Sequence, residues 1–274
     1  MQVHDRIPVS NLDKRPQRPR ALREALAVFG GVGAVTWIAS RMEALPLLRN
    51  HLHLVVGTLF LLVALRCAER LPGGLSRYGL SLGGLFADES AEPGAPPPEL
   101  RGGWADRFGA VRELGAALIG ALPAFLRELA VAALVCAAIF PPFVLGFYFW
   151  HRPPHPFVFL PQRELGSYVM TQVLVVGLPE EAFFRGYLLG RLRDALPGRM
   201  PWLRVELSAA AWLLQALLFA LLHFVIDWHV ARLAVFFPAL LFGWLAALRG
   251  GIGAAILVHA ACNVLSDLLV RGWL

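Results

Sequence analysis

Residues 175–189 read Val-Val-Gly-Leu-Pro-Glu-Glu-Ala-Phe-Phe-Arg-Gly-Tyr-Leu-Leu. Two adjacent carboxylates, Glu180 and Glu181, and the guanidinium of Arg185 interrupt an otherwise apolar stretch. A charged side chain at the centre of a bilayer costs roughly 2.5–3.5 kcal/mol on insertion scales. Charged residues in such a position are therefore candidates for a functional site, and their partners should lie in other apolar segments.

The composition around this stretch is that of a membrane protein. Of the 274 residues, 57% are hydrophobic and 16% are charged, whereas about 25% are charged in an average soluble domain. Basic residues gather over 15–23 and 191–204, which is typical of cytoplasmic loops. The net charge of +6 comes with no nucleic-acid-binding motif, so we expect membrane lipid and not nucleic acid as a partner.

The apolar runs predict an all-α fold, a polytopic transmembrane helical bundle with seven to eight membrane helices. We expect a disordered basic tail over residues 1–20 and a single membrane domain over 21–274. The expected spans are 25–40, 51–65, 129–150, 164–196, 207–226, 231–248 and 254–270. The first two runs are short for a bilayer, so flanking residues should extend them.

Three further segments are expected outside these spans. Residues 71–85 are rich in glycine and leucine and should lie at the membrane interface, and the acidic, proline-rich residues 87–100 indicate a solvated loop. Apolar residues recur at helical spacing over 104–128, which predicts an interfacial amphipathic helix. The span that follows is interrupted by Pro141 and Pro142.

The spacing of the charged residues distinguishes the two glutamates. Glu181 and Arg185 are i,i+4 neighbours, which allows an ion pair on one helix face. Glu180 is turned by about 100° from Glu181 and cannot share that pairing as well. We therefore expect Glu181 and Arg185 to be structural and Glu180 to be free for proton transfer.

Two more polar clusters interrupt later apolar runs. Phe219 precedes His223 by one turn in the first, and His259 and Asn263 are i,i+4 neighbours in the second. A glutamate, two histidines and an asparagine can form a water-activating site, in which N–H donors bind the developing oxyanion. A single buried histidine or asparagine is more often a hydrogen-bonded core residue, so the prediction depends on the three clusters occurring together.

The three clusters, taken in order, resemble a known family. Glu-Glu-x-x-x-Arg, Phe-x-x-x-His and His-x-x-x-Asn are similar to the motifs of the CAAX-protease and bacteriocin-processing membrane endopeptidases, also called the CPBP or Abi family. The resemblance covers about residues 165–270, and the protease-like core is expected over 105–270.

The resemblance implies an intramembrane glutamic endopeptidase, a peptide hydrolase acting on a membrane-associated protein or peptide. The residues carried over as catalytic are Glu180 and His223, which would activate water, and His259 and Asn263, which would bind the oxyanion. Glu181, Arg185 and Phe219 would be structural at the site. The family includes proteases of prenylated C-terminal tails, and some bacterial members resemble myxosortases. Lys14 is the only lysine among 25 basic residues, which suggests a GC-rich bacterial genome; we therefore expect the bacterial inner membrane and a C-terminal tag or peptide as substrate.

Alternatives of other classes stay open. A transporter or proton relay also uses buried glutamate and histidine, although the absence of an internal repeat disfavours it. A non-catalytic membrane scaffold could use the same fold. We expect no cofactor, because the zinc motif His-Glu-x-x-His is absent; the alternative is a zinc ion held by Glu180, His223 and His259.

Helix geometry adds one more expectation. With simple spans, Glu180 and His223 would differ in depth by about 18 Å, at 1.5 Å per residue. The glutamate helix should therefore be longer than one simple span, with Pro179 beginning a new helical segment or a kink. A water-filled cavity should adjoin the glutamates.

Overall fold

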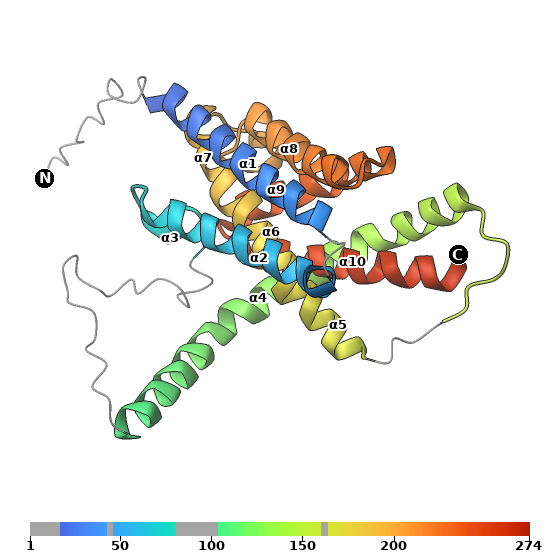
Figure 1. Cartoon of the computed structure of the whole chain (residues 1–274), viewed down its shortest axis with the longest axis horizontal. Helices are drawn as coiled ribbons and strands as arrows, with labels where there is room; N and C mark the ends of the chain where they lie inside the picture. Colours follow the sequence, from blue (N-terminus) through green and yellow to red (C-terminus); the bar gives the residue numbers. More distant parts are fainter. Residues whose placement is uncertain (1–16, 43–45, 81–103, 160–163) are drawn as a thin grey trace, which may run out of the picture.

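The computed structural model describes residues 17–42, 46–80, 104–159 and 164–274. Within these ranges the chain is almost entirely helical, and β-structure is limited to a bridge between Met200 and Val205. Figure 1 shows the helices gathered into a bundle, with one long helix extending beyond it. The all-α fold expected from the apolar runs is confirmed.

Long helices alternate with short helical segments along the chain. The first half contains α1 (Gln17–Arg41), α2 (Pro46–Glu69), α3 (Gly74–Arg77) and α4 (Trp104–His151). A continuous helical run over 165–195, here called the glutamate helix, has five segments: α5 (Leu165–Thr171), η3 (Gln172–Gly177), α6 (Leu178–Glu181), η4 (Ala182–Leu188) and α7 (Leu189–Ala195). The chain ends with η5 (Pro201–Leu203), α8 (Ala209–Asp227), η6 (Val230–Val235), α9 (Phe236–Arg249) and α10 (Gly253–Trp273).

Six helices of the described part are long and apolar enough to cross a membrane. They are Arg18–Arg41, His51–Glu69, Leu118–His151, Ala209–Asp227, Val230–Arg249 and Gly253–Trp273. The glutamate helix packs among them, against α1, α2 and α10. The chain is therefore an integral membrane protein whose two glutamates lie on a helix inside the bundle.

The first two spans are longer than their apolar runs. Helix α1 begins at Gln17, inside the expected tail, and α2 has 24 residues. In α1, Arg20 pairs with Glu24 at 2.7 Å, and this i,i+4 contact stabilises the basic first turns. The extension by flanking residues is thus confirmed. Residues 1–16 and the expected loop over 87–100 lie outside the described residues.

Helix α4 corrects one expectation. It is continuous over 48 residues and includes Pro123, Pro141 and Pro142. The expected span over 129–150 lies within the membrane-span candidate Leu118–His151, whereas the expectation of a separate helix over 104–128 is wrong, because no break divides it from that span. Glu128 of α4 pairs with Arg249 at 2.5 Å and accepts the N–H of Ala254 at 3.2 Å. Arg249 ends α9, Ala254 lies in the first turn of α10, and both side chains of the pair are partly exposed, so Glu128 lies near one end of the bundle and α4 continues past it without a break. Neighbouring helices allow proline inside membrane helices.

Phenylalanine rings form the core next to the glutamates. Phe183 and Phe184 are fully buried. Phe60 of α2 stacks on Phe183 at 5.3 Å between centroids, and Phe219 of α8 contacts the ring of Phe184 edge-on at 4.8 Å. At Gly57 of α2 an added Cβ would lie 2.6 Å from a backbone carbonyl oxygen of η3, so only glycine permits this approach. The glutamate helix is thereby fixed against α2 and α8.

Residues 71–80, here called the docking segment, pack on the C-terminal part of the glutamate helix, formed by η4 and α7. At Gly186 an added Cβ would lie 2.4 Å from Cδ2 of Leu80, and at Gly190 it would lie 2.3 Å from Cδ1 of Tyr78. The carbonyl oxygen of Gly79 accepts the N–H of Ile252 at 3.3 Å. The segment, expected only to lie at the membrane interface, is thus held between the glutamate helix and the turn from α9 to α10.

Candidate functional site

The two glutamates lie in one α-helical turn between two π-helical segments. Helix α6 carries Glu180 and Glu181, with η3 before it and η4 after it. Pro179 is in the first turn of α6 and has no N–H to donate to the helix. The hydrogen-bonding pattern changes from π- to α-helical at Leu178, one residue before Pro179, within one continuous helix. The segment with the glutamates thus begins one residue earlier than expected. π-Helical turns within longer helices are frequent at functional sites.

Glu181 is completely buried and has two hydrogen-bond partners. Nη1 of Arg185 donates to Oε1 of Glu181 at 2.9 Å, and both side chains are completely buried. Nδ1 of His259 lies 2.8 Å from the same oxygen, and because a carboxylate oxygen accepts, this nitrogen donates. The ion pair expected from the i,i+4 spacing is present, and the structure adds the contact with His259.

Aromatic rings enclose the guanidinium of Arg185. Its Cζ lies 4.4 Å, 5.2 Å and 5.8 Å from the ring centroids of Phe219, Phe242 and Phe184. Among the described residues its Nε and Nη2 have no hydrogen-bond partner. A ring face attracts a cation with about 2 kcal/mol or more where water is excluded. The three rings therefore offset part of the free-energy cost of burying a guanidinium whose Nε and Nη2 donors have no partner. They also hold the guanidinium against Glu181.

Glu180 is more open than Glu181. Its side chain is 20% exposed, and its Oε2 lies 3.8 Å from Nε2 of His259. This distance is too long for a hydrogen bond, and Oε2 has no hydrogen-bond partner in the described ranges. Oε2 of Glu181 also lacks a partner there, but its Oε1 is bonded to both Arg185 and His259. The two glutamates therefore differ in exposure and in ion pairing: Glu180 is partly exposed and, within the described part of the chain, has no ion pair at hydrogen-bond distance.

His259 lies between the two carboxylates. One ring nitrogen contacts Glu181 and the other faces Glu180, and the ring stacks on Phe242 at 4.9 Å between centroids. The stacking and the Glu181 contact fix both the position and the orientation of the imidazole. The residue is 6% exposed, so its place in the bundle is well defined.

His223 adjoins this group without touching a glutamate. Its ring lies 4.4 Å from the ring of Phe219, which in turn covers Arg185. Its Nδ1 is 2.9 Å from the carbonyl oxygen of Phe219, and since that oxygen only accepts, Nδ1 donates and Nε2 retains its lone pair. No hydrogen bond or ion pair joins His223 to Glu180 within the part of the chain that the structure describes.

Asn263 has a partner that the sequence reasoning missed. Its Nδ2 donates to Oε1 of Gln172 at 2.9 Å. Gln172 begins η3 and precedes Glu180 by eight residues, about two helical turns. It is an amide in the mainly apolar run that leads to the glutamates, and that position could have marked it as a candidate. Phe242 was missed as well, because an aromatic residue in an apolar helix carries no such signal.

The structure therefore brings the predicted residues together to different degrees. Glu180, Glu181, Arg185 and His259 form one connected group, and Phe219 links this group to His223. Asn263 is bonded to Gln172 on the same two helices that carry Glu180 and His259. The assignment of individual catalytic roles stays a prediction, as does the water-filled cavity beside the glutamates.

Among the described residues, no group of three or more His, Cys, Asp or Glu side chains is placed to hold a metal ion. The zinc alternative requires Glu180, His223 and His259 to converge on one point. Of these three, Glu180 and His259 are close to each other, at 3.8 Å.

Fold and site together define a polytopic helical membrane protein with a buried carboxylate–histidine group. Residues 162–265 match the family model described as type II CAAX prenyl endopeptidase Rce1-like. This segment contains all three polar clusters, and the match points to a CAAX-type protease, a peptide hydrolase. It covers less than half of the chain. Neither the curated proteins nor the solved structures gave a match.

Proposed function

We propose that this chain is an intramembrane endopeptidase that uses Glu180 to activate water. The observation that carries the proposal is the contrast between the two glutamates. Glu181 is completely buried and bonded to Arg185 and His259, whereas Glu180 is 20% exposed, lies 3.8 Å from His259 and has no ion pair at hydrogen-bond distance among the residues that the structure describes. A free carboxylate held next to an ordered histidine is suited to proton transfer.

The proposed reaction begins with removal of a proton from water by Glu180. The hydroxide adds to the carbonyl carbon of the scissile peptide, and the carbonyl oxygen becomes the oxyanion. The proton then passes to the leaving nitrogen as the C–N bond breaks, which yields a carboxylic acid and an amine. Nε2 of His223, the ring nitrogen left as an acceptor, can hold the same water.

The oxyanion requires N–H donors. Nδ2 of Asn263 carries two hydrogens, and the bond to Gln172 uses one of them. The other is available to an oxyanion, and Nε2 of His259 can donate when the ring is protonated. The loss of one oxyanion donor typically reduces the rate by about 10²–10³.

Paired substitutions at the two glutamates test the proposal. Glu180→Gln should reduce hydrolysis of a peptide substrate in proteoliposomes by about 10²–10⁴ with an unchanged unfolding temperature, because it removes the base and leaves the fold intact. Glu181→Gln should lower the unfolding temperature and the folded yield, because it removes the buried partner of Arg185. Full hydrolysis by well-folded Glu180→Gln would contradict the proposal.

We propose further that no metal takes part. A chelator applied to the folded protein should then leave hydrolysis unchanged. If activity is lost with the metal content and returns on addition of zinc, the alternative site at Glu180, His223 and His259 becomes the better explanation.

The family match supports a proposal for the substrate class. The matched family is described as prenyl endopeptidases, and we propose a C-terminal tail or other peptide at the membrane, in a bacterial inner membrane, as the substrate here. A myxosortase-like specificity for tails that contain cysteine belongs to this proposal. Comparison of the membrane proteins that accumulate uncleaved in cells with and without the chain would identify the substrate.

A further inference from the structure

A basic pocket lies at the end of the glutamate helix, away from the proposed catalytic group. It has a volume of about 370 Å³ and lies between α7, the docking segment and the loop from α7 to α8. Its lining includes Arg77, Arg193, Arg199, Asp194, Glu206 and Ser208. Small-molecule pockets commonly occupy about 300–1,000 Å³, so the space is sufficient for a small polar ligand.

Both carboxylates of the pocket are already paired. Asp194 accepts from Nη2 of Arg77 at 2.5 Å, and Glu206 accepts from Nε of Arg199 at 3.0 Å. Asp194 is also bonded to Arg191 at 3.1 Å. A metal ion would have to displace guanidinium groups from these oxygens, so the pocket does not suit a cation.

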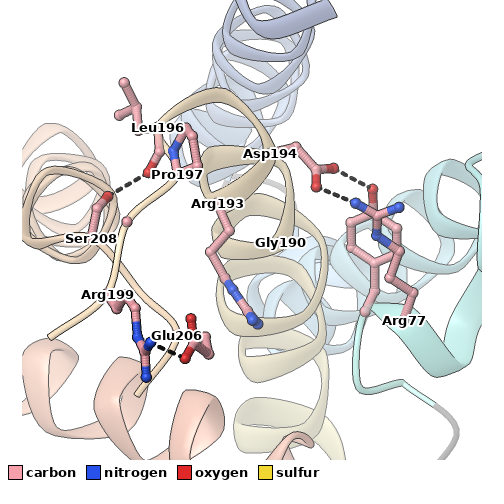
Figure 2. A pocket seen from close by; sticks show the side chains of 11 residues that line it. Arg77, Gly190, Arg193, Asp194, Leu196, Pro197, Arg199, Glu206 and Ser208 are labelled. Atoms are coloured by element: carbon pink, nitrogen blue, oxygen red, sulfur yellow. Dashed lines mark hydrogen bonds and ion pairs between the residues drawn. The ribbon is translucent and has the colours of Figure 1, made fainter. Parts of the chain in front are cut away.

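Arg193 provides the uncompensated charge. Figure 2 shows its side chain between the Arg199–Glu206 pair and the Arg77–Asp194 pair, with no interaction to either. Among the described residues Arg193 takes part in no ion pair, although it is only partly exposed. Within the described part of the chain the pocket therefore presents a guanidinium that is bonded to no carboxylate, and this is the group that binds phosphate in a bidentate manner.

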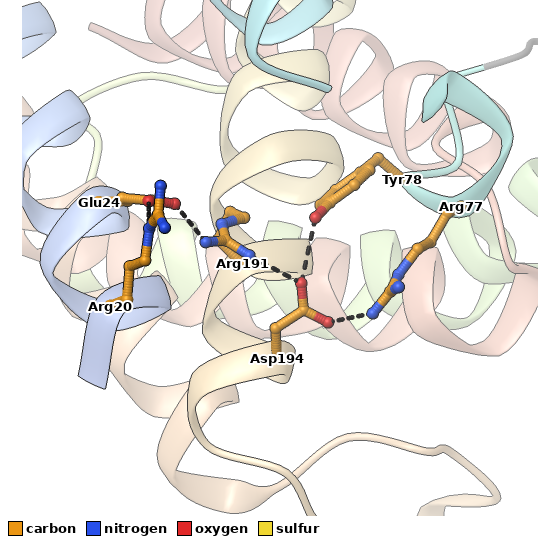
Figure 3. A network of polar contacts seen from close by, with 6 residues as sticks. All are labelled: Arg20, Glu24, Arg77, Tyr78, Arg191 and Asp194. Atoms are coloured by element: carbon orange, nitrogen blue, oxygen red, sulfur yellow. Dashed lines mark hydrogen bonds and ion pairs between the residues drawn. The ribbon is translucent and has the colours of Figure 1, made fainter. Parts of the chain in front are cut away.

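Ion pairs and a hydrogen bond join the residues next to the pocket to one another. Figure 3 shows a network in which Arg191 joins Glu24 of α1 to Asp194 of α7. Burial, followed by the nearby charge of Asp194, raises the pKa of Tyr78 to about 12, so its hydroxyl remains protonated and donates to Asp194 at 3.1 Å. Asp194 is thus paired with the neighbouring arginines and with Tyr78, and Arg193 remains available to bind a ligand.

The second contact would come from Arg199. Its pair with Glu206 is exposed, 68% and 66% for the two side chains, and exposed pairs of this kind contribute little free energy. A phosphate can therefore exchange with Glu206 at small cost. Helix α8, 19 residues long, begins beside Ser208 and adds the positive field of its N-terminus.

We propose that the basic pocket binds a phosphate-bearing anion, with Arg193 as the main contact and Arg199 as the second. The phosphate can belong to the headgroup of an anionic phospholipid or to a free phosphate. The pocket lies at the end of the bundle where α7 ends and α8 begins, so both sources can reach it.

Thermal unfolding of the full chain in a neutral detergent tests this site independently of hydrolysis. The probes are inorganic phosphate and short-chain phosphatidylglycerol, with short-chain diacylglycerol as the phosphate-free control and ionic strength held constant. A ligand that binds the folded state raises the unfolding temperature with concentration, which gives an apparent Kd. Loss of one charge-assisted contact in Arg193→Gln should weaken that Kd by about tenfold or more.

Arg23→Gln is the matched control, because Arg23 is an exposed arginine near the start of α1 and lies outside the pocket lining. It should keep the wild-type Kd. If Arg193→Gln unfolds earlier without any probe, Arg199→Gln replaces it and should also weaken binding. A response to phosphatidylglycerol alone assigns the site to a headgroup, and a response to inorganic phosphate assigns it to free phosphate. Equal Kd values for wild type and both pocket variants, or no response to either probe, would overturn the proposal.

Discussion

At the scale of single residues, the two neighbouring glutamates of the site differ in burial and in ion pairing. Glu181 and Arg185 form a completely buried ion pair within one helix, and Phe219 and Phe242 cover its positive end. The attraction has to offset the loss of hydration of both charges. Glu180, one residue earlier, is 20% exposed, and no described residue forms an ion pair with it at hydrogen-bond distance.

The first prediction concerns the positive end of this pair. Arg185→Gln should destabilise the fold by about 3–5 kcal/mol, because it leaves a buried carboxylate with His259 as its remaining partner. Thermal unfolding followed by tryptophan fluorescence measures the loss. The double variant Glu181→Gln/Arg185→Gln, which buries no charge at either position, should unfold at a higher temperature than Arg185→Gln. Equal temperatures for the two variants would show that the charge of Glu181 is not the cause.

The residues that could be predicted from sequence are those related by helical spacing. The Glu181–Arg185 pair follows from i,i+4 geometry, which a single helix fixes without reference to the rest of the fold. The bonds from Asn263 to Gln172 and from Glu128 to Arg249 join different helices. Their partners depend on how the helices pack, and no spacing along the chain specifies that.

At the scale of helices, the glutamate helix is shaped by its small residues and its proline. Pro179 lies in the first turn of α6, directly before the glutamates, and Gly57 of α2 allows close packing at that point. The long helix around 180 was expected from the depth argument. The continuity of α4 was not, because a change from amphipathic to apolar sequence near residue 128 does not specify whether the helix breaks there.

The second prediction concerns the groove for the docking segment. Gly190→Ala should destabilise the protein, because the new methyl group would overlap the ring of Tyr78. Overpacking costs about 1–3 kcal/mol, which exceeds the gain of about 1 kcal/mol from replacing glycine in a helix. The unfolding temperature should fall, and trypsin should cleave the docking segment faster at Arg77.

Gly146→Ala in α4 provides the matched comparison. An added Cβ at Gly146 has no heavy atom within 4 Å, so the variant should be as stable as wild type or slightly more stable. If Gly190→Ala behaves in the same way, the docking segment is not held by close packing on the glutamate helix.

At the scale of the whole molecule, arginines distinguish one end of the bundle. The start of α1, the docking segment, the end of α7 and the start of α8 adjoin there, as the contacts of Glu24 with Arg191 and of Arg77 with Asp194 demonstrate. At the opposite end, Arg41 of α1 donates to the carbonyl oxygen of Ile226 in α8 at 2.8 Å. The positive-inside rule therefore predicts that the end with the basic pocket faces the cytoplasm.

This orientation gives the last prediction. With Cys67, Cys136 and Cys262 replaced by serine, Arg204→Cys should react with a membrane-impermeant maleimide only in inside-out vesicles. His229→Cys, in the exposed connection between α8 and η6, should react in right-side-out vesicles, because α8 has 19 residues and spans about 28 Å at 1.5 Å per residue, close to the thickness of the hydrocarbon core. Reversed labelling would place the basic pocket outside the cell, and phosphate groups of the inner leaflet could then not reach Arg193. Labelling of both positions from one side would mean that α8 does not cross the membrane.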